Sequence, residues 1–142
     1  MIRRAAVQAL AAALMLTGCG LLGGGIRVEE AWARPALAGS NSAVYFRLVN
    51  WGESDRLIGV RAAIAPQAAV HRTRTDPQGM MHMEAQEAVA LPHNTEVVFE
   101  PGGLHIMLLG LTQDLLLDES TSITLVFEQA GEVIVDVPVE SR

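Results

Sequence analysis

Histidine and methionine, two residue types that bind metal ions through nitrogen and sulfur, are concentrated in one part of this chain of 142 residues. All four histidines lie between positions 71 and 105. Outside the first fifteen residues, every methionine lies in "GMMHM" (79–83) or "GLHIML" (103–108). Thioether sulfur is a soft, uncharged ligand that suits Cu(I) together with imidazole, whereas calcium and magnesium prefer oxygen and zinc rarely takes methionine. The alternative interpretation is that the methionines fill gaps in a core and the histidines are hydrogen-bonded core residues.

The spacing within the two segments decides which of these side chains could meet. Side chains alternate between the two faces of a β-strand, so residues two apart share a face. His105 therefore shares a face with Met107, and Met81 shares a face with Met83. His71 would arrive from the strand before them. A β-sandwich could present all of these residues around one point: His71, Met81, Met83, His105 and Met107.

The remainder of the chain predicts the strands that would position this site. Short segments with period-two alternation are separated by turn residues, which is typical of an all-β antiparallel β-sandwich or open barrel. Residues 111–120 could include a helical turn. The predicted strands cover residues 26–35, 42–50, 56–62, 68–74, 80–85, 95–101, 104–111, 122–129 and 132–139.

The N-terminus predicts export and a lipid anchor. Residues 1–18 combine two arginines with an apolar run too short for a stable membrane span, as in a secretory signal peptide. The end of this segment, "LTGC" (16–19), resembles a bacterial lipobox, in which the chain is cut before the cysteine and the cysteine is lipidated. We therefore expect Cys19 and the glycine-rich tether (19–25) to join a β domain (26–142) to a membrane, in the periplasm or at the cell surface.

Composition excludes several classes of function. After removal of the signal, eight arginines and no lysine remain against sixteen acidic residues, which gives no support for nucleic-acid binding. Cys19 is the only cysteine, so once it is lipidated the domain has no thiolate metal site, disulfide or cysteine nucleophile. No nucleophile elbow and no phosphate-binding glycine loop is present, so we expect a protein that is not an enzyme.

The segment from Val70 to Leu111 resembles the signature of PCuAC, a family of periplasmic copper chaperones for Cu(A) sites. That signature is a histidine, a methionine after ten intervening residues, and a His-x-Met motif after twenty-one more. Here twenty-one residues separate Met83 from His105, and Met107 completes the motif. Eleven residues intervene between His71 and Met83, so a strict count of ten intervening residues from His71 instead reaches His82. The second ligand is thus Met83 or His82. Met83 is preferred because it keeps the spacing of twenty-one residues and shares a face with Met81, and a turn easily absorbs one extra residue.

This resemblance implies a fold, a cargo and partners. The fold would be cupredoxin-like, with a solvent-accessible Cu(I) site formed by His71, Met83, His105 and Met107, near which Met81 is a further possible ligand. The copper would pass to the Cu(A) centre of cytochrome oxidase subunit II, often alongside a Sco-type thiol protein. Two alternatives remain open: a copper-sequestering or resistance lipoprotein with the same site, and a β-sandwich interaction module that binds no metal.

Overall fold

The computed structural model describes residues 25–142 of the chain. The predicted signal peptide (1–18), the predicted lipidation site at Cys19 and the predicted tether up to residue 24 lie outside the described residues. In the part that is described, no helix is long and apolar enough to cross a bilayer.

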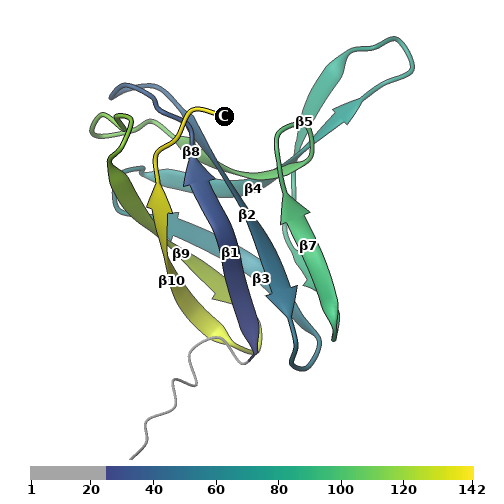
Figure 1. Cartoon of the computed structure of the whole chain (residues 1–142). Coiled ribbons are helices and arrows are strands. Elements are labelled where there is room, and N and C mark those ends of the chain that lie inside the picture. Colours follow the sequence, from purple (N-terminus) through teal and green to yellow (C-terminus); the bar gives the residue numbers. More distant parts are fainter. Residues whose placement is uncertain (1–24) are drawn as a thin grey trace, which may run out of the picture.

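The described residues form ten β-strands in two packed sheets (Figure 1). The strands are β1 (Ile26–Ala33), β2 (Ser42–Asn50), β3 (Asp55–Ala62), β4 (Gln67–Thr75), β5 (Met81–Ala85), β6 (Val89–Leu91), β7 (Thr95–Phe99), β8 (Leu104–Leu109), β9 (Ser120–Phe127) and β10 (Gly131–Pro138). The larger sheet has the order β1-β2-β7-β8-β4-β5 and the smaller has the order β10-β9-β3-β6. All strand pairings are antiparallel except that of β7 with β8. The predicted all-β antiparallel sandwich is therefore confirmed.

Two features of the chain differ from the sequence prediction. The short strand β6 is not among the predicted strands, because three residues before a proline are too few to show an alternating pattern. No helical turn forms within residues 111–120. Leu115 instead makes an isolated bridge with Ala36, and the chain around it runs through turns.

The core lies between the two sheets, and every strand except the exposed β5 contributes residues to it. On β8, Leu104, Ile106 and Leu108 are buried in this core. Because side chains alternate along a strand, His105 and Met107 point to the opposite, outer face of the larger sheet. The metal-binding residue types on β8 are thus separated from the core by the sheet itself.

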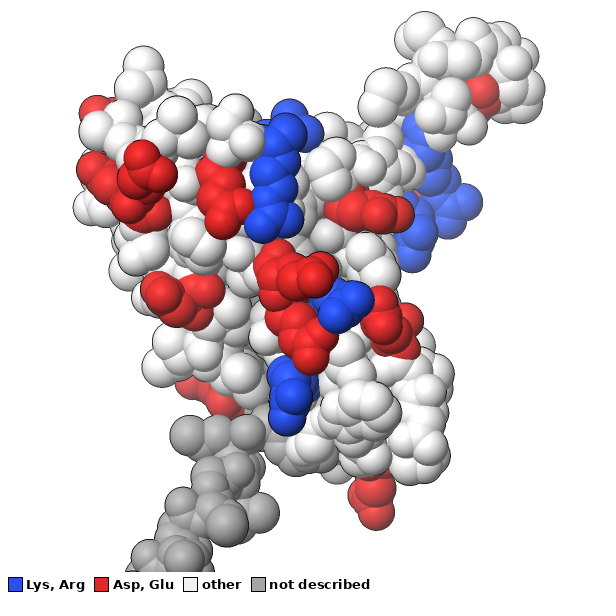
Figure 2. Space-filling view, in the orientation of Figure 1, with Lys and Arg blue, Asp and Glu red and all other residues white. Residues whose placement is uncertain are grey.

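The hairpin formed by β4 and β5 projects from the body of the sandwich (Figure 1). Strand β5 pairs only with β4, and all five of its residues are exposed. Few charged side chains lie at the outer end of this hairpin in the view of Figure 2. The predicted methionine segment is therefore an exposed edge strand and not part of the core.

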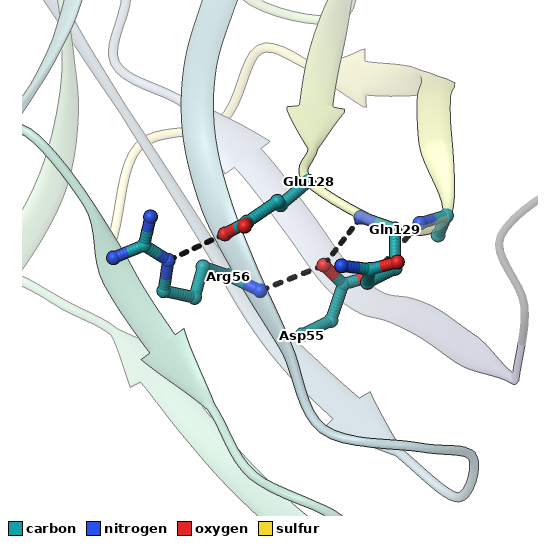
Figure 3. Close-up of polar contacts among 5 residues, drawn as sticks. Asp55, Arg56, Glu128 and Gln129 are labelled. Atoms are coloured by element: carbon teal, nitrogen blue, oxygen red, sulfur yellow. Dashed lines mark hydrogen bonds and ion pairs between the residues drawn. The ribbon is translucent and has the colours of Figure 1, made fainter.

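At the end of the smaller sheet, the buried carboxylate of Asp55 ties β3 to the β9–β10 hairpin (Figure 3). Its Oδ1 accepts hydrogen bonds from the backbone N–H groups of Arg56 at 2.7 Å and Gln129 at 2.8 Å. Its Oδ2 accepts another from Ala130 at 2.9 Å. An ionised carboxylate makes stronger hydrogen bonds than a neutral acceptor, so the two bonds from Gln129 and Ala130 fix the hairpin against β3, while the bond from Arg56 lies within β3 itself.

Substitution of Asp55 by alanine should destabilise the domain by about 2–4 kcal/mol, because it leaves several backbone N–H groups without an acceptor. Urea unfolding of the wild type and of Asp55→Ala measures the difference. The matched control is Asp136→Ala, which removes an exposed carboxylate from β10 and should change the free energy of unfolding little. Equal losses in the two variants would contradict a structural role for Asp55.

Candidate metal centre

One recess on the outer face of the larger sheet gathers four of the predicted site residues. They are Met81, Met83, His105 and Met107. The recess has a volume of about 380 Å³, and it lies where β1 ends and β2 begins, since Arg34 and Ser42 also line it. Three thioethers and one imidazole therefore face a common space that is open to solvent.

The pairing of β4 with two different strands brings these residues together. His71 lies opposite His105 on β8, and Thr73 lies opposite Met83 on β5. Directly opposed residues of an antiparallel pair share a face and lie side by side. Strand β4 thus places the β8 residues and the β5 residues on one continuous surface, although Met83 and His105 are far apart in the sequence.

His105 is positioned as a ligand with a free lone pair. Its side chain is only 3% exposed, and its Nδ1 lies 3.1 Å from the carbonyl oxygen of Gly103. Because a carbonyl can only accept, Nδ1 carries the hydrogen and Nε2 is left unprotonated in the neutral ring. Nε2 is buried without a hydrogen-bond partner. Metal-bound histidines commonly donate their other N–H to a backbone carbonyl in this way, which fixes the ring and its tautomer.

The surroundings of His105 disfavour its protonation. Burial is the largest effect and lowers the pKa below the ordinary value of 6.5. The hydrogen bond to Gly103 acts in the opposite direction, while the charges of His71 and Arg34 lower the pKa further. The neutral form, which is the one that binds metal, is therefore favoured over a wider pH range than in an exposed histidine.

His71 stands beside His105 and not along the wall of the recess. The two rings are 5.9 Å apart between centroids and are inclined at 79°, an edge-to-face arrangement. The Nδ1 of His71 is also buried without a hydrogen-bond partner. Both imidazoles thus have a buried nitrogen with no partner among the described residues, which is uncommon for buried polar groups.

The methionines of the hairpin are not core residues. Met80, Met81 and Met83 are 61%, 68% and 59% exposed, whereas Met107 on the body of the sandwich is half-buried. Exposure of three large apolar side chains on one strand and its turn has no benefit for stability. The interpretation that these methionines fill gaps in the core is therefore wrong for the hairpin.

The other two histidines lie outside the recess. His82 is on the opposite face of β5, where its Nε2 lies 2.9 Å from Oδ2 of Asp76. The pKa of Asp76 is lowered, first by this contact with His82 and then by the hydrogen bond from the N–H of Met80. His93 lies near the other end of the domain, where its ring contacts the carbonyl of Gly52. The structure thus brings Met83, and not His82, into the recess with His105.

Several residues that shape the site were not predicted from the sequence. Tyr45 lines the recess with its ring centroid 6.4 Å from that of His105, and its ring lies against Trp32 in a tilted arrangement, with 4.7 Å between centroids. The guanidinium of Arg34 also lies over the Tyr45 ring, 5.5 Å from its centroid. The alternation of β2 predicts that Tyr45 and Ala43 share a face. It does not predict that β2 lies next to β8, so the contact could not be found without the strand order.

The composition of the recess restricts the type of metal. No three His, Cys, Asp or Glu side chains within residues 25–142 are grouped so that they could hold a metal ion. A metal bound here would therefore need methionine sulfur in addition to imidazole nitrogen. Such a ligand set favours Cu(I) over zinc, calcium or magnesium.

Comparison with known proteins identifies relatives that are similar to this chain in sequence. The family model described as "Putative lipoprotein LpqE-like" matches residues 26–139 of the chain. The chain is 30% identical over 139 residues to "Putative lipoprotein Lxx21020" of Leifsonia xyli subsp. xyli, and the match covers 89% of this chain and 83% of the relative.

Solved structures give the same fold. "Copper-bound PCuAC domain from PmoF2" has a TM-score of 0.70 and 32% identity, and the match covers 84% of this chain and 95% of that domain. "Solution structure of CuI-DR1885 from Deinococcus Radiodurans" has a TM-score of 0.60 and 25% identity, over 80% of this chain and 78% of that one. The resemblance to PCuAC in the sequence is therefore confirmed at the level of the whole domain.

The environment of His105 predicts its titration in the metal-free protein. Histidine ring NMR signals recorded against pH should show His105 taking up its proton below pH 6.5. Because the unfolded chain binds this proton more readily, the free energy of unfolding should fall as the pH is lowered below about 6.5 and should be fully regained above it.

Comparison with His105→Gln isolates this effect. Glutamine cannot take up a proton, so the decrease in stability between pH 6.5 and 5.5 should be smaller in the variant. An equal pH dependence in the two proteins, or protonation of His105 above pH 6.5, would contradict the effect of burial.

Proposed function

We propose that this chain, which belongs to the LpqE-like lipoprotein family and has the PCuAC fold, is an extracytoplasmic copper chaperone that carries Cu(I). The observation that supports this most is the buried, unpartnered Nε2 of His105 beside a recess lined by three methionines. The copper named in the titles of two structural neighbours, one of them as CuI, agrees with this cargo.

The proposed ligands are the four residues of the sequence motif: His71, Met83, His105 and Met107. His105 and Met107 belong to the rigid body of the sandwich, while Met83 comes from the projecting hairpin. Met81 also lines the recess and is a possible additional ligand. His82 is the weaker alternative to Met83, because its ring faces away and is engaged by Asp76.

This ligand set suits transfer of a metal better than permanent storage. All four ligands are neutral, so they hold Cu(I) without the strong binding of thiolates. Met83 is 59% exposed, so a partner can approach the ion from the hairpin side. The proposed recipients are a Sco-type thiol protein or the Cu(A) site of cytochrome oxidase subunit II, and Cys19 would hold the chaperone at the membrane where these partners reside.

Substitution of the ligands should weaken Cu(I) binding by about tenfold or more, since even changes around metal ligands commonly cost that much. The measurement is an anaerobic titration against a chromophoric Cu(I) chelator, with His105→Ala, Met83→Leu and Met107→Leu. Met80→Leu is the matched control, because Met80 is similarly exposed but does not line the recess. Leucine preserves the volume of methionine and removes only the sulfur.

The titration also tests the two alternatives for the second ligand. His82→Ala should bind as tightly as the wild type if Met83 is a ligand. A loss of affinity in His82→Ala with none in Met83→Leu would reverse this assignment. Absence of Cu(I) binding in the wild type would support an interaction module that binds no metal.

Delivery can be distinguished from sequestration by mixing the Cu(I)-loaded protein with a reduced Sco-type protein. Because thiolates bind Cu(I) more strongly than thioethers, copper should move to the partner when the two are separated and the metal in each is measured. Retention of the copper on this chain would instead favour a sequestering lipoprotein.

A further inference from the structure

We propose that Trp51 inserts into the headgroup region of the membrane that holds the anchor, and so orients the domain with its metal recess directed away from the lipid. This inference rests on the lipid anchor at Cys19 in the proposed function. It concerns the opposite end of the domain from the recess, and it concerns a residue that has no part in metal binding.

The chain that leads to the anchor leaves the domain directly beside Trp51. The carbonyl of Gly25 accepts a hydrogen bond from the backbone N–H of Trp51 at 3.1 Å. Gly25 has a φ of +95°, and a Cβ atom at this position would lie 2.8 Å from the backbone nitrogen of Gly52. Only glycine therefore permits this close approach, which fixes the exit of the tether against residues 51 and 52.

The length of the tether keeps this end of the domain near the lipid. Six residue steps separate Cys19 from Gly25, and an extended chain of that length spans at most about 20 Å. A lipidated Cys19 must therefore lie within about this distance of the 51–52 backbone. The tether therefore keeps the surface around Trp51 within reach of the lipid.

Trp51 is exposed to solvent on a turn that hydrogen bonds of the preceding residue hold in place. Its side chain is 64% exposed, whereas the preceding residue, Asn50, is fully buried. The Asn50 amide donates to the carbonyls of Glu53 at 2.8 Å and Leu91 at 2.9 Å, and its Oδ1 accepts from Gly52 at 2.9 Å. Among residues 25–142 the Trp51 indole has no hydrogen bond, aromatic or cation–π partner. Tryptophan is the side chain that membrane interfaces favour, with its ring in the apolar zone and its N–H among the headgroups.

The charge of the protein indicates that this contact is apolar. The mature chain has eight arginines, no lysine and sixteen acidic residues, and Glu53 lies two residues after Trp51. Attraction to anionic lipid would need a basic surface instead. The expected partner is therefore a lipid interface that need not carry negative charge.

This orientation separates the membrane from the site. Strand β2 runs from Ala43, which lines the recess, to Asn50 before the turn (Figure 1). Seven residues of strand correspond to about 23 Å. With Trp51 at the lipid, the recess would face the aqueous compartment, where a copper-receiving protein can reach it.

Tryptophan fluorescence of the mature, lipidated protein in phosphatidylcholine vesicles tests the proposal, because the chain has only two tryptophans and Trp32 is 6% exposed. In Trp32→Phe, Trp51 is the only emitter. Its emission should shift to shorter wavelength in vesicles and should lose most of its intensity when the acyl chains are brominated. In Trp51→Phe, the emission of Trp32 should be unchanged by bromination.

Three controls make the result decisive. The difference in emission between the wild type and Trp51→Phe gives the emission of Trp51 in a protein whose Trp32 packing is unchanged. Unlipidated Cys19→Ser should show the emission of water-exposed Trp51. Equal emission of Trp32→Phe in brominated and ordinary vesicles would overturn the proposal, as would a mass showing no lipid on Cys19. A Cu(I) titration on the same vesicles reports failure of the metal function separately, because Trp51 lies outside the recess.

Discussion

The double pairing of β4 is the constraint on which the proposed metal centre depends. Strand β8 on one side brings His105 opposite His71, and β5 on the other side brings Met83 opposite Thr73. A slip of one residue in either ladder would turn the corresponding proposed ligands to the opposite face of the sheet. The extra residue between His71 and Met83 causes no such slip, because residues 76–80 form the loop of the hairpin, closed by the hydrogen bond from Asp76 N–H to the carbonyl of Met80 at 2.8 Å.

The two halves of the centre differ in rigidity, and this difference has a chemical meaning. His105 is held by the core beneath it, by its bond to Gly103 and by neighbouring Tyr45, so its lone pair has a fixed direction. Met81 and Met83 lie on an exposed edge strand with a single partner strand. A preorganised imidazole lowers the entropy cost of capturing an ion, while mobile thioethers can adjust to the ion and then be replaced by a partner's ligands.

The sequence predicted the fold class and the shared faces of the site because both follow from period-two alternation. The segment "LHIML" indicates a strand with Ile106 and Leu108 in the core and with His105 and Met107 on the outer face, and the structure has this arrangement. The order of strands in the sheets does not follow from local patterns, so the approach of Tyr45 to the site could not be predicted. The expected helical turn in 111–120 failed for a similar reason, since the bridge of Leu115 to a distant residue overrides local preference.

The two ends of the sandwich differ in whether their buried polar groups have hydrogen-bond partners. At the tether end, Asn50 and Asp55 are buried polar residues whose hydrogen bonds are satisfied by backbone groups of the loops around them. At the recess end, the buried nitrogens of His71 and His105 are left without partners. Satisfied buried polar groups add rigidity, whereas unsatisfied ones cost stability that a bound ligand can return. Among residues 25–142, the polar groups of Asn50 and Asp55 are thus satisfied within the protein, whereas His71 and His105 each have a buried nitrogen that a soft metal ion would satisfy.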